Sequence, residues 1–358
     1  MKYGIVTFHR TLNPGATLQA YALCERLRRF GVDCDVLDYR CASVERREYA
    51  FQKASSPLKN VAKRALWLAS AAKRRNQEKR FFATLKNAGM LSAKSYDAAS
   101  LKDANDVYDG FITGSDQVWN LNITENDWNF FLAFAAEEKR RYAFSASVGE
   151  FWPTEKNEEV VKLLRRYRLA SARESMDVAT LNEKYGLAFE HVCDPTMLLT
   201  ADEWARLAVR PNESDYVLLY APKTGVEKAA ELYAEKHGKK LVRMGSGKVA
   251  LREKKKTISV TSEEWIGRIA NAAAVFTDSY HGLLFSLYFQ KPVWSAYVGK
   301  RASRQTSLFK RLDLRDCVYE RPEDLDREID YSVYAPRIDA FRKESEAFLQ
   351  KIAEDMRR

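Results

Sequence analysis

Apolar and polar positions along this chain form two alternating patterns. Short apolar runs, typical of buried strands, are followed by stretches in which apolar residues recur every three or four positions, typical of helices. The first run covers residues 2–8 and precedes a loop over 9–15, a helical pattern over 17–30 and a second apolar run over 34–39. This strand, helix, strand order predicts a parallel, right-handed unit, the opening of a Rossmann-like sheet.

The same alternation continues in two series. The first predicts strands over 107–113, 142–147 and 169–172, and a helix over 154–167. The second predicts strands over 216–221, 240–244, 274–277 and 293–296, and helices over 226–237, 262–272 and 281–289. The best linker signal between the two series is Pro211-Asn212-Glu213-Ser214, because these residue types interrupt regular structure.

The length of 358 residues fits two domains of ordinary size. We therefore predict an α/β fold with two Rossmann-like domains facing each other across a cleft. We expect the N-terminal domain over residues 1–205, the C-terminal domain over 206–334 and a C-terminal helix over 335–358 that packs back on the N-terminal domain.

Composition and charge narrow the class of protein. No run approaches the roughly 18 apolar residues of a membrane span, and the start of the chain lacks a secretory pattern, so we expect a cytoplasmic location. The five cysteines are scattered without metal-ligand spacing, which predicts neither a disulfide framework nor a metal site. The formal charge of +10 favours an anionic partner, but no nucleic-acid-binding motif accompanies it.

The densest positive charge lies between residues 57 and 86, on a helical pattern. Its basic residues are Lys63, Arg64, Lys73, Arg74, Arg75, Lys79 and Arg80. One interpretation is a helix with a buried apolar stripe and a solvated face. The other is a helix that lies on an anionic membrane surface, which predicts peripheral contact with the inner face of the cell membrane.

Polar residues gather where predicted strands end, which is where parallel α/β sheets bind their ligands. Asp278-Ser279-Tyr280-His281-Gly282 follows one strand and opens a helix, whose N-terminus favours an anion. Ser279 or Asp278 can cap that helix, and Gly282 lets a ligand approach the backbone. His281 can donate to a phosphate oxygen or transfer a proton. The alternative is a capped helix whose histidine bonds a backbone carbonyl.

The stretch from Thr113 to Asn120 also follows a strand. Its hydroxyls, amides and carboxylate lie next to an indole, a combination that suits a sugar ring; the residues concerned are Ser115, Asp116, Gln117, Trp119 and Asn120. Asp116 is the first choice for a base that accepts a proton from a hydroxyl. The alternative is an Asx turn that caps the next element.

Three other positions could contribute to a site. The loop that contains Asn13 lacks the GxGxxG spacing of dinucleotide binding, and Gln19 could reach back from the following helix. Arg173 could grip a carboxylate through two hydrogen bonds, or form a surface pair with Glu174. Arg301 and Arg304 could enclose an anionic donor, or be solvated. The chain contains no P-loop and no nucleophile elbow.

Several segments together resemble the polysaccharide pyruvyl transferase family. They are GIVTFHRTLNPGATLQAYAL, GFITGSDQVWN, SASVG, SARE, DPTMLL and FTDSYHG followed by KPV. The resemblance extends over nearly the whole chain, in order. It implies a GT-B-like pair of Rossmann domains and transfer of an enolpyruvyl unit from phosphoenolpyruvate to two hydroxyls of a polysaccharide precursor. The products would be a cyclic ketal and free phosphate, with neither a metal nor a nucleotide as cofactor.

The resemblance also implies residue roles. His281 matches the motif histidine and Arg173 the arginine of the Arg-Glu motif. Catalytic roles then fall to His281 and Asp116; donor binding to Arg173, Ser279, Tyr280, Gly282, Arg301 and Arg304; and acceptor binding to Asn13, Gln19, Ser115, Gln117, Trp119 and Asn120. We place the donor on the C-terminal domain and the saccharide acceptor, in one version lipid-linked, on the N-terminal domain.

Two alternatives stay open. Some branches of the family have Ser-Arg-Leu-His where this chain has residues 278–281, so an arginine is missing beside the donor. Either Arg301 or Arg304 replaces it, or this member catalyses another reaction. A GT-B nucleotide-sugar glycosyltransferase in polysaccharide synthesis would hold a diphosphate at the same helix N-terminus, and a glycan-binding module would have no activity.

Overall fold

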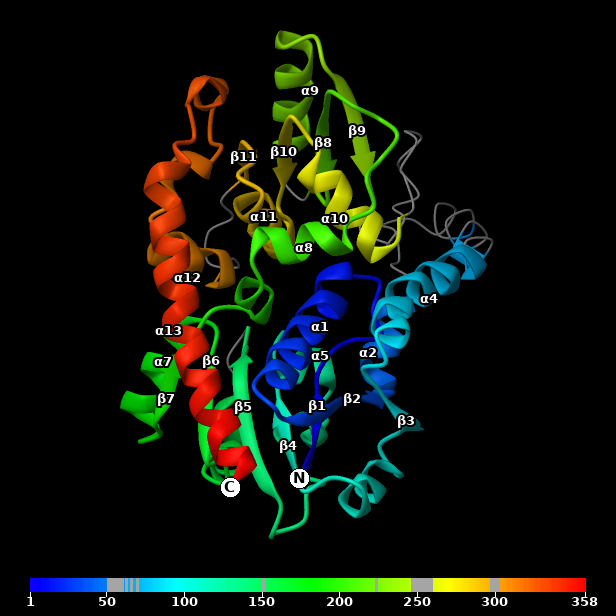
Figure 1. Cartoon of the computed structure of the whole chain (residues 1–358), viewed down its shortest axis with the longest axis vertical. Coiled ribbons are helices and arrows are strands. Elements are labelled where there is room, and N and C mark those ends of the chain that lie inside the picture. The colour runs from blue at the N-terminus through cyan, green and yellow to red at the C-terminus, as the bar shows by residue number, and fades with distance from the viewer. Residues whose placement is uncertain are drawn as a thin grey trace.

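In the computed structural model, two parallel β-sheets form the centres of two α/β lobes, one above the other in Figure 1. Every strand pair within both sheets is parallel. The predicted fold class, α/β with two Rossmann-like domains, is confirmed. The structure describes residues 1–49, 61, 64, 67–68, 71–149, 152–222, 225–245, 260–296 and 303–358.

The first lobe contains a seven-stranded sheet in the order β3-β2-β1-β4-β5-β6-β7. Its strands are β1 (Lys2–Val6), β2 (Asp33–Tyr39), β3 (Leu91–Tyr96), β4 (Gly110–Thr113), β5 (Arg140–Ala146), β6 (Leu169–Ala172) and β7 (Phe189–His191). The strand order reverses between β1 and β4. In open parallel sheets, such a switch point is where ligands bind, at the carboxyl ends of the strands.

The helices of the first lobe cover both faces of this sheet. They are α1 (Pro14–Arg29), α2 (Ala42–Tyr49), α4 (Ala71–Asn87), α5 (Leu121–Thr124), α6 (Asn157–Leu164) and α7 (Ser175–Ala179), with α8 (Ala201–Leu207) between the two sheets in sequence. The start of α1 is well defined, because the side chain of Asn13 accepts a hydrogen bond from the Gly15 N–H and Pro14 suits the first turn. Leu18 and Leu23 of α1 are fully buried in the core.

The second lobe contains a four-stranded sheet in the order β11-β10-β8-β9. Its strands are β8 (Tyr216–Tyr220), β9 (Lys240–Met244), β10 (Ala274–Thr277) and β11 (Val293–Trp294), and its helices are α9 (Val226–Lys236), α10 (Ser262–Ala270), α11 (Tyr280–Tyr288) and α12 (Ser303–Leu312). The switch point of this sheet lies between β8 and β10. It therefore faces the start of α11, which follows β10 directly.

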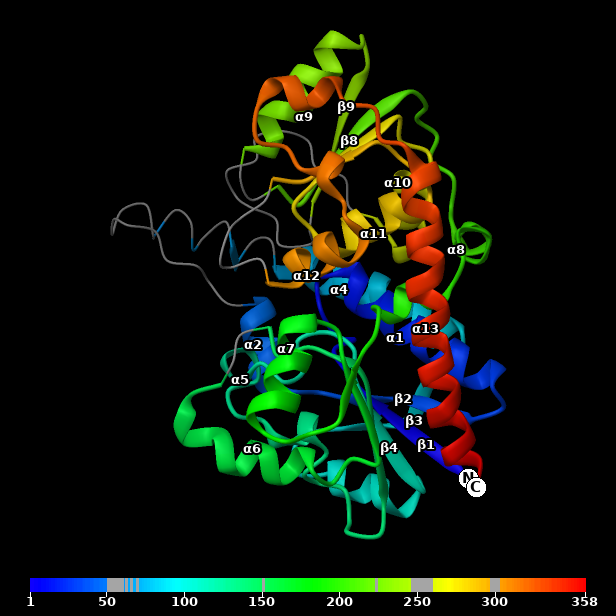
Figure 2. The ribbon, with the colours of Figure 1, turned by 90° about the vertical axis from the view of Figure 1, so that its left-hand side faces the viewer.

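The last helix, α13 (Tyr331–Arg357), runs from the second lobe along the side of the first (Figures 1 and 2). Near its start, the Tyr331 hydroxyl donates to the Lys291 carbonyl of the second lobe, at 2.5 Å. Near its end, the Met356 carbonyl accepts from the Tyr3 hydroxyl of the first lobe, at 2.8 Å. The start of the helix thus contacts the second lobe, and its end contacts the first.

The basic stretch is described mainly over α4. Phe81 and Leu85 are buried, and Gln77 donates to the carbonyl of Val260 in the second lobe. Over residues 71–87 the helix therefore has a buried stripe, whereas Lys63 lies outside the described residues. Contact with a membrane stays a prediction. Within the described ranges, no helix combines the length and the apolar character needed to cross a bilayer.

Candidate active site

The switch points of the two sheets meet at the junction between the lobes. His281, in the first turn of α11, lies directly on Gly15, in the first turn of α1. A Cβ atom at residue 15 would lie 2.2 Å from His281 Nδ1, far inside van der Waals contact. Glycine is therefore required here by the close approach of the imidazole, and the predicted donor and acceptor sides come together at this contact.

The start of α11 is organised by two hydroxyl groups. The Ser279 hydroxyl accepts from the Gly282 N–H at 3.2 Å, and Thr277 Oγ1 accepts from the Ser279 N–H at 3.0 Å. Gly282 is packed against the strand, since a Cβ there would lie 2.7 Å from Thr277 Oγ1. Tyr280 and His281 occupy the first turn, where a helix offers no internal acceptor for their backbone N–H groups.

Asp194 is the centre of the junction, and the sequence did not single it out as a site residue. Its buried carboxylate accepts from Arg173 Nη1 at 2.8 Å and from the N–H and hydroxyl of Thr196 at 3.0 and 2.7 Å. Its Oδ2 lies 3.4 Å from His281 Nε2. Burial alone would raise the pKa of Asp194, but His281 and Arg173 hold it well below its usual range. Asp194 is therefore a carboxylate.

His281 is 2% exposed and has one nitrogen without a hydrogen bond among the described residues. Its Nε2 is close enough to Asp194 for an ion pair, but the contact is not aligned as a hydrogen bond. The alternative in which the histidine bonds a backbone carbonyl is not what the described residues show. A buried ring nitrogen without a partner is uncommon and calls for an explanation, such as a bound ligand.

Arg173 is buried and held on several sides. Besides Asp194, its guanidinium donates through Nε to Glu174 at 3.1 Å and stacks 4.7 Å from the centroid of the Tyr280 ring. The predicted Arg-Glu pair is therefore present, but in the interior. Nη2 has no hydrogen-bond partner among the described residues and lies 3.9 Å from Asp116 Oδ1. This N–H face of the arginine is buried beside the Asp116 carboxylate.

Asp116 lies on the first-lobe side of the same junction. It is 7% exposed, has a φ of 69° and accepts from the Gln117 N–H at 2.8 Å. This local hydrogen bond resembles the predicted Asx-type alternative. Its position beside Arg173 nevertheless leaves the carboxylate next to the unpartnered guanidinium nitrogen.

Ser115 and Gln19 connect the junction to the first sheet. The Ser115 hydroxyl donates to the Ser145 carbonyl at 2.8 Å and lies 3.5 Å from Asp194. Gln19 accepts from the Ser115 N–H at 3.0 Å and donates to Thr7 Oγ1 at 2.8 Å. Gln19 thus supports the backbone beneath the junction.

Other predicted acceptor residues have structural partners in this conformation. Trp119 is fully buried, stacks on Phe131 and donates to the Phe130 carbonyl. Asn120 caps α5 and Asn13 caps α1. The side chain of Gln117 lies against Gly149. Of the donor residues, Arg301 lies outside the described residues, and so does the side chain of Arg304.

A second carboxyl pair lies next to Arg173, and only the Arg-Glu motif pointed to it in the sequence. Glu174 and Asp177 are one turn apart at the start of α7, and Asp177 accepts from the Val148 N–H at 3.3 Å. Burial and the neighbouring Glu174 raise the pKa of Asp177 to about 8. Asp177 therefore holds a proton at neutral pH.

No group of three or more His, Cys, Asp or Glu side chains within the described ranges is placed to hold a metal ion. The site residues that the structure brings together are His281, Arg173, Asp116, Ser115 and Tyr280, with Asp194 and Gly15 as additions. They combine a helix N-terminus, a guanidinium and an imidazole around one carboxylate. Such a junction can bind an oxyanion and move a proton.

Comparison with known proteins gives the following matches. The sequence model described as polysaccharide pyruvyl transferase matches residues 13–298. Among solved structures, the chain is similar to the UDP-GlcNAc 2-epimerase of Methanocaldococcus jannaschii in complex with UDP-GlcNAc and UDP, with 11% identity, a TM-score of 0.48 and coverage of 95% of this chain and 92% of that one. It is also similar to an alpha-glucosyltransferase in complex with UDP, with 10% identity, a TM-score of 0.45 and coverage of 98% and 95%. No curated protein matches the sequence.

Proposed function

The chain belongs to the polysaccharide pyruvyl transferase family, and on this premise we propose that it transfers an enolpyruvyl group from phosphoenolpyruvate to saccharide hydroxyls. The product is a pyruvate ketal on a polysaccharide precursor, and phosphate is released. The observation that carries this proposal is the pair of buried nitrogens that make no hydrogen bond among the described residues, His281 Nε2 and Arg173 Nη2, at the junction of the lobes. The first turn of α11 adds backbone N–H groups to them.

These groups match the two anionic parts of phosphoenolpyruvate. A phosphate is favoured at the start of α11, because backbone N–H groups and the helix dipole both favour negative charge there. A carboxylate is favoured at Arg173, whose planar guanidinium suits carboxylate geometry. The buried setting strengthens both interactions, because little water screens them.

The proposed chemistry uses His281 as the acid and Asp116 as the base. His281 gives a proton to the methylene carbon of the donor, and C2 becomes an oxocarbenium-like centre. One acceptor hydroxyl adds to C2 and loses its proton to Asp116. The C2–O bond to phosphate then breaks, and the second hydroxyl closes the ketal. The two acceptor hydroxyls together lose two protons. One makes up for the proton that the methylene carbon gains, and the other leaves with phosphate.

Asp194 acts through the other two side chains. Its carboxylate lies between Arg173 and His281 and fixes both relative to the first turn of α11. We assign it as a positioning residue. Because Gly15 covers the imidazole, donor entry requires the lobes to separate at this contact.

Release of inorganic phosphate from phosphoenolpyruvate in the presence of saccharide acceptors tests the proposal. His281→Gln is expected to lower kcat by about 10²–10⁴, the range for loss of a general acid. The matched control is His237→Gln, at an exposed histidine of α9's C-terminal end. Near-normal turnover of the His281 variant would remove the donor-site assignment. Calorimetric binding of UDP- or GDP-sugars without binding of phosphoenolpyruvate would favour the glycosyltransferase alternative.

We also propose that the enzyme acts in the cytoplasm, at the inner face of the membrane, on a lipid-linked acceptor. The exposed side of α4 supports this, because Arg75, Lys79 and Lys86 are exposed there. Such a cluster is attracted to anionic lipid at low ionic strength. Flotation with phosphatidylglycerol vesicles should show binding at low salt that weakens at moderate salt, and no binding at either would remove the membrane contact.

A further inference from the structure

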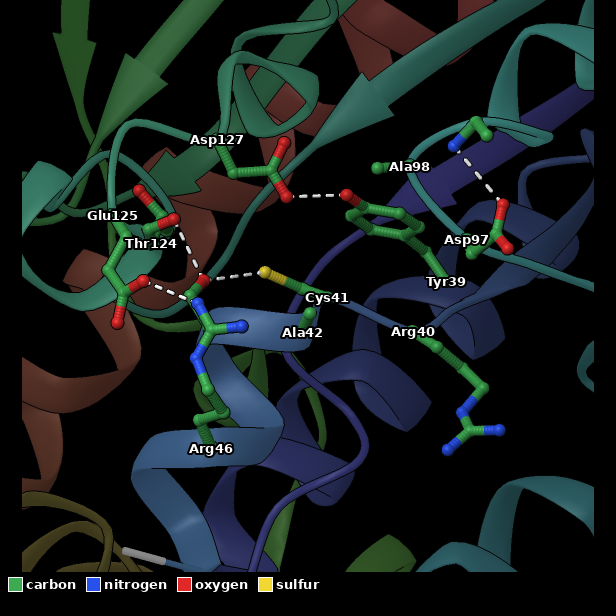
Figure 3. A pocket seen from close by; sticks show the side chains of 12 residues that line it. Tyr39, Arg40, Cys41, Ala42, Arg46, Asp97, Ala98, Thr124, Glu125 and Asp127 are labelled. Atoms are coloured by element: carbon green, nitrogen blue, oxygen red, sulfur yellow. Dashed lines mark hydrogen bonds and ion pairs between the residues drawn. The ribbon is translucent and has the colours of Figure 1, made fainter.

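A groove crosses the carboxyl edge of the first sheet, away from Asp194 and His281. Its larger part is a hollow of about 410 Å³ between the ends of β2 and β3, the start of α2 and the end of α5 (Figure 3). A second hollow of about 340 Å³ continues it, and Arg40, Ala42 and Asp97 line both. Each volume lies within the roughly 300–1,000 Å³ of small-ligand sites.

The inner end of the groove lies near the candidate active site. A third hollow of only about 10 Å³ shares Tyr39 and Cys41 with the larger one and extends to Thr7. Thr7 Oγ1 donates to the Ser115 carbonyl at 2.8 Å and accepts from Gln19. A ligand in the two larger hollows would therefore lie along the sheet edge at the ends of β2 and β3, with one end directed towards Thr7.

The lining of the groove mixes polar and apolar surface and carries more carboxylates than guanidinium groups. Carboxylates come from Glu45, Asp97, Glu125 and Asp127, and guanidinium groups from Arg40 and Arg46. Figure 3 shows Arg46 reaching Glu125, and the Tyr39 hydroxyl reaching Asp127. Excess negative charge disfavours phosphoenolpyruvate and nucleotide diphosphates here. Carboxylates instead accept strong hydrogen bonds from neutral hydroxyls.

We propose that this groove binds neutral sugar residues of the acceptor beyond the one that receives the pyruvyl group. The acceptor is then an oligosaccharide rather than a monosaccharide. This inference rests on the proposed function for the identity of the acceptor. The groove also provides an acceptor surface on the first lobe to which the buried indole of Trp119 does not contribute.

The Arg46–Glu125 pair offers a variant that leaves the fold intact. Their side chains are 62% and 57% exposed, so their ion pair contributes little to stability. The double variant Arg46→Ala with Glu125→Ala removes both from the wall of the groove. The control is Glu137→Ala with Arg166→Ala, an Arg–Glu ion pair at the amino ends of β5 and β6, far from the groove, with side chains 91% and 24% exposed.

Binding is measured first, by calorimetry and saturation-transfer NMR, without phosphoenolpyruvate. The probes are neutral tetrasaccharides of glucose, mannose, galactose and N-acetylglucosamine, each compared with its monosaccharide. We expect at least one tetrasaccharide to bind more tightly than its monosaccharide. The groove variant should raise its Kd about tenfold, as expected for the loss of a charge-assisted hydrogen bond, and the control variant should leave it unchanged.

Turnover separates the groove from the donor chemistry. With the tetrasaccharide that binds, the groove variant should raise the acceptor KM about tenfold, while kcat and the KM for phosphoenolpyruvate stay near the native values. The proposal that the groove binds the acceptor is overturned if no tetrasaccharide binds, or if the groove variant binds it as tightly as the native chain. If the groove variant weakens saccharide binding, the groove is an acceptor site, even where no phosphate is released. Absence of phosphate release would then overturn only the proposed function.

Discussion

The buried carboxylate of Asp194 lies between two basic side chains, those of Arg173 and His281. Asp194→Asn keeps the size of the side chain but removes the charge that faces Arg173 at 2.8 Å. Breaking a buried ion pair by removing one partner costs about 3–5 kcal/mol, because the remaining charge stays buried. Because Arg173 keeps its buried pair with Glu174, we expect a loss at the lower end of this range, about 3 kcal/mol, in the free energy of unfolding, measured by urea denaturation at pH 7.

The comparison variant is Asp103→Asn, which breaks the ion pair with Lys94. Both side chains of that pair are exposed, at 42% and 55%, so the expected loss is about 0–1 kcal/mol. A loss for the Asp194 variant no larger than for Asp103 would contradict a central role of Asp194 in holding the junction together.

The raised pKa of Asp177 predicts how stability changes with pH. Between about pH 4 and pH 8, the folded chain keeps a proton that the unfolded chain has lost. The free energy of unfolding therefore falls as pH rises through this window. Asp177→Asn mimics the protonated carboxyl and removes that dependence. Relative to the native chain, we expect the variant to gain about 1–3 kcal/mol of stability between pH 5 and pH 8.5.

Urea denaturation at the two pH values checks this expectation. A difference between variant and native chain that stays constant, or that shrinks with rising pH, would mean that Asp177 is ionised in the folded protein. Glu174 shares the same buried space and contributes to the raised pKa of Asp177.

Single residues show what the sequence could and could not reveal. His281, Arg173 and Asp116 were identified because each follows a predicted strand, and the structure places them at one junction. Asp194 follows a strand of only three residues at the sheet edge, which gives too short an apolar pattern to recognise. Trp119 was interpreted as a sugar platform, but whether an indole faces a ligand or the core depends on neighbours such as Phe131 that are not adjacent in sequence.

Two helix starts, those of α1 and α11, form one of the contacts between the lobes. Gly15→Ala places a methyl group 2.2 Å from the unsubstituted position of His281 Nδ1, so the imidazole must move or the lobes must separate. Displacement of a reacting group by about 1 Å can cost about 100-fold in rate. We expect a fall of about 10- to 100-fold in kcat for phosphate release, with the fold retained by circular dichroism.

The double variant Gly15→Ala with His281→Gly serves as its control. His281 Cβ would also lie 2.8 Å from the new methyl group, so the whole side chain has to be removed to make room for it. The glycine change should then have little further effect on stability in that background. An equal loss of stability with and without the imidazole would show that the alanine acts on α1 itself.

At the level of elements, the strands of the second sheet were predicted well, whereas β3 and β7 at the two edges of the first sheet were missed. β6, β8 and β10 are largely buried, and their apolar runs identified them almost to the residue. β3 has three consecutive exposed residues, and it pairs with a neighbour on one side only, because it lies at the edge of its sheet. The short helices α2 and α5 were also missed, since too few residues form a helical period there.

The molecule as a whole depends on long-range contacts that periodicity does not encode. Apolar patterns predicted two sheets but not that their switch points meet at Gly15 and His281. They predicted a C-terminal helix, yet not its hydrogen bonds with the first strand. These contacts join residues far apart in sequence, so only the packing of complete lobes specifies them.

The end of α13 gives a test at this scale. Arg168 forms two hydrogen bonds with the Asp355 carboxylate, at 2.6 and 2.8 Å, and the Tyr142 hydroxyl donates to it at 2.6 Å. Asp355→Ala should lower the free energy of unfolding by about 1–2 kcal/mol at pH 7, because Arg168 is half exposed and solvent weakens the pair.

Hydrogen exchange shows where this loss occurs. The last turns of α13 should exchange faster in the Asp355 variant, whereas β8 and β10 of the second lobe should keep their protection. The hydrogen bonds with Arg168 lower the pKa of Asp355 to about 2, so its contribution is present above about pH 4 and disappears as pH falls towards 2. The difference between variant and native chain should therefore shrink at pH 3. Uniformly faster exchange in both lobes would instead mean that α13 stabilises the molecule as one cooperative unit.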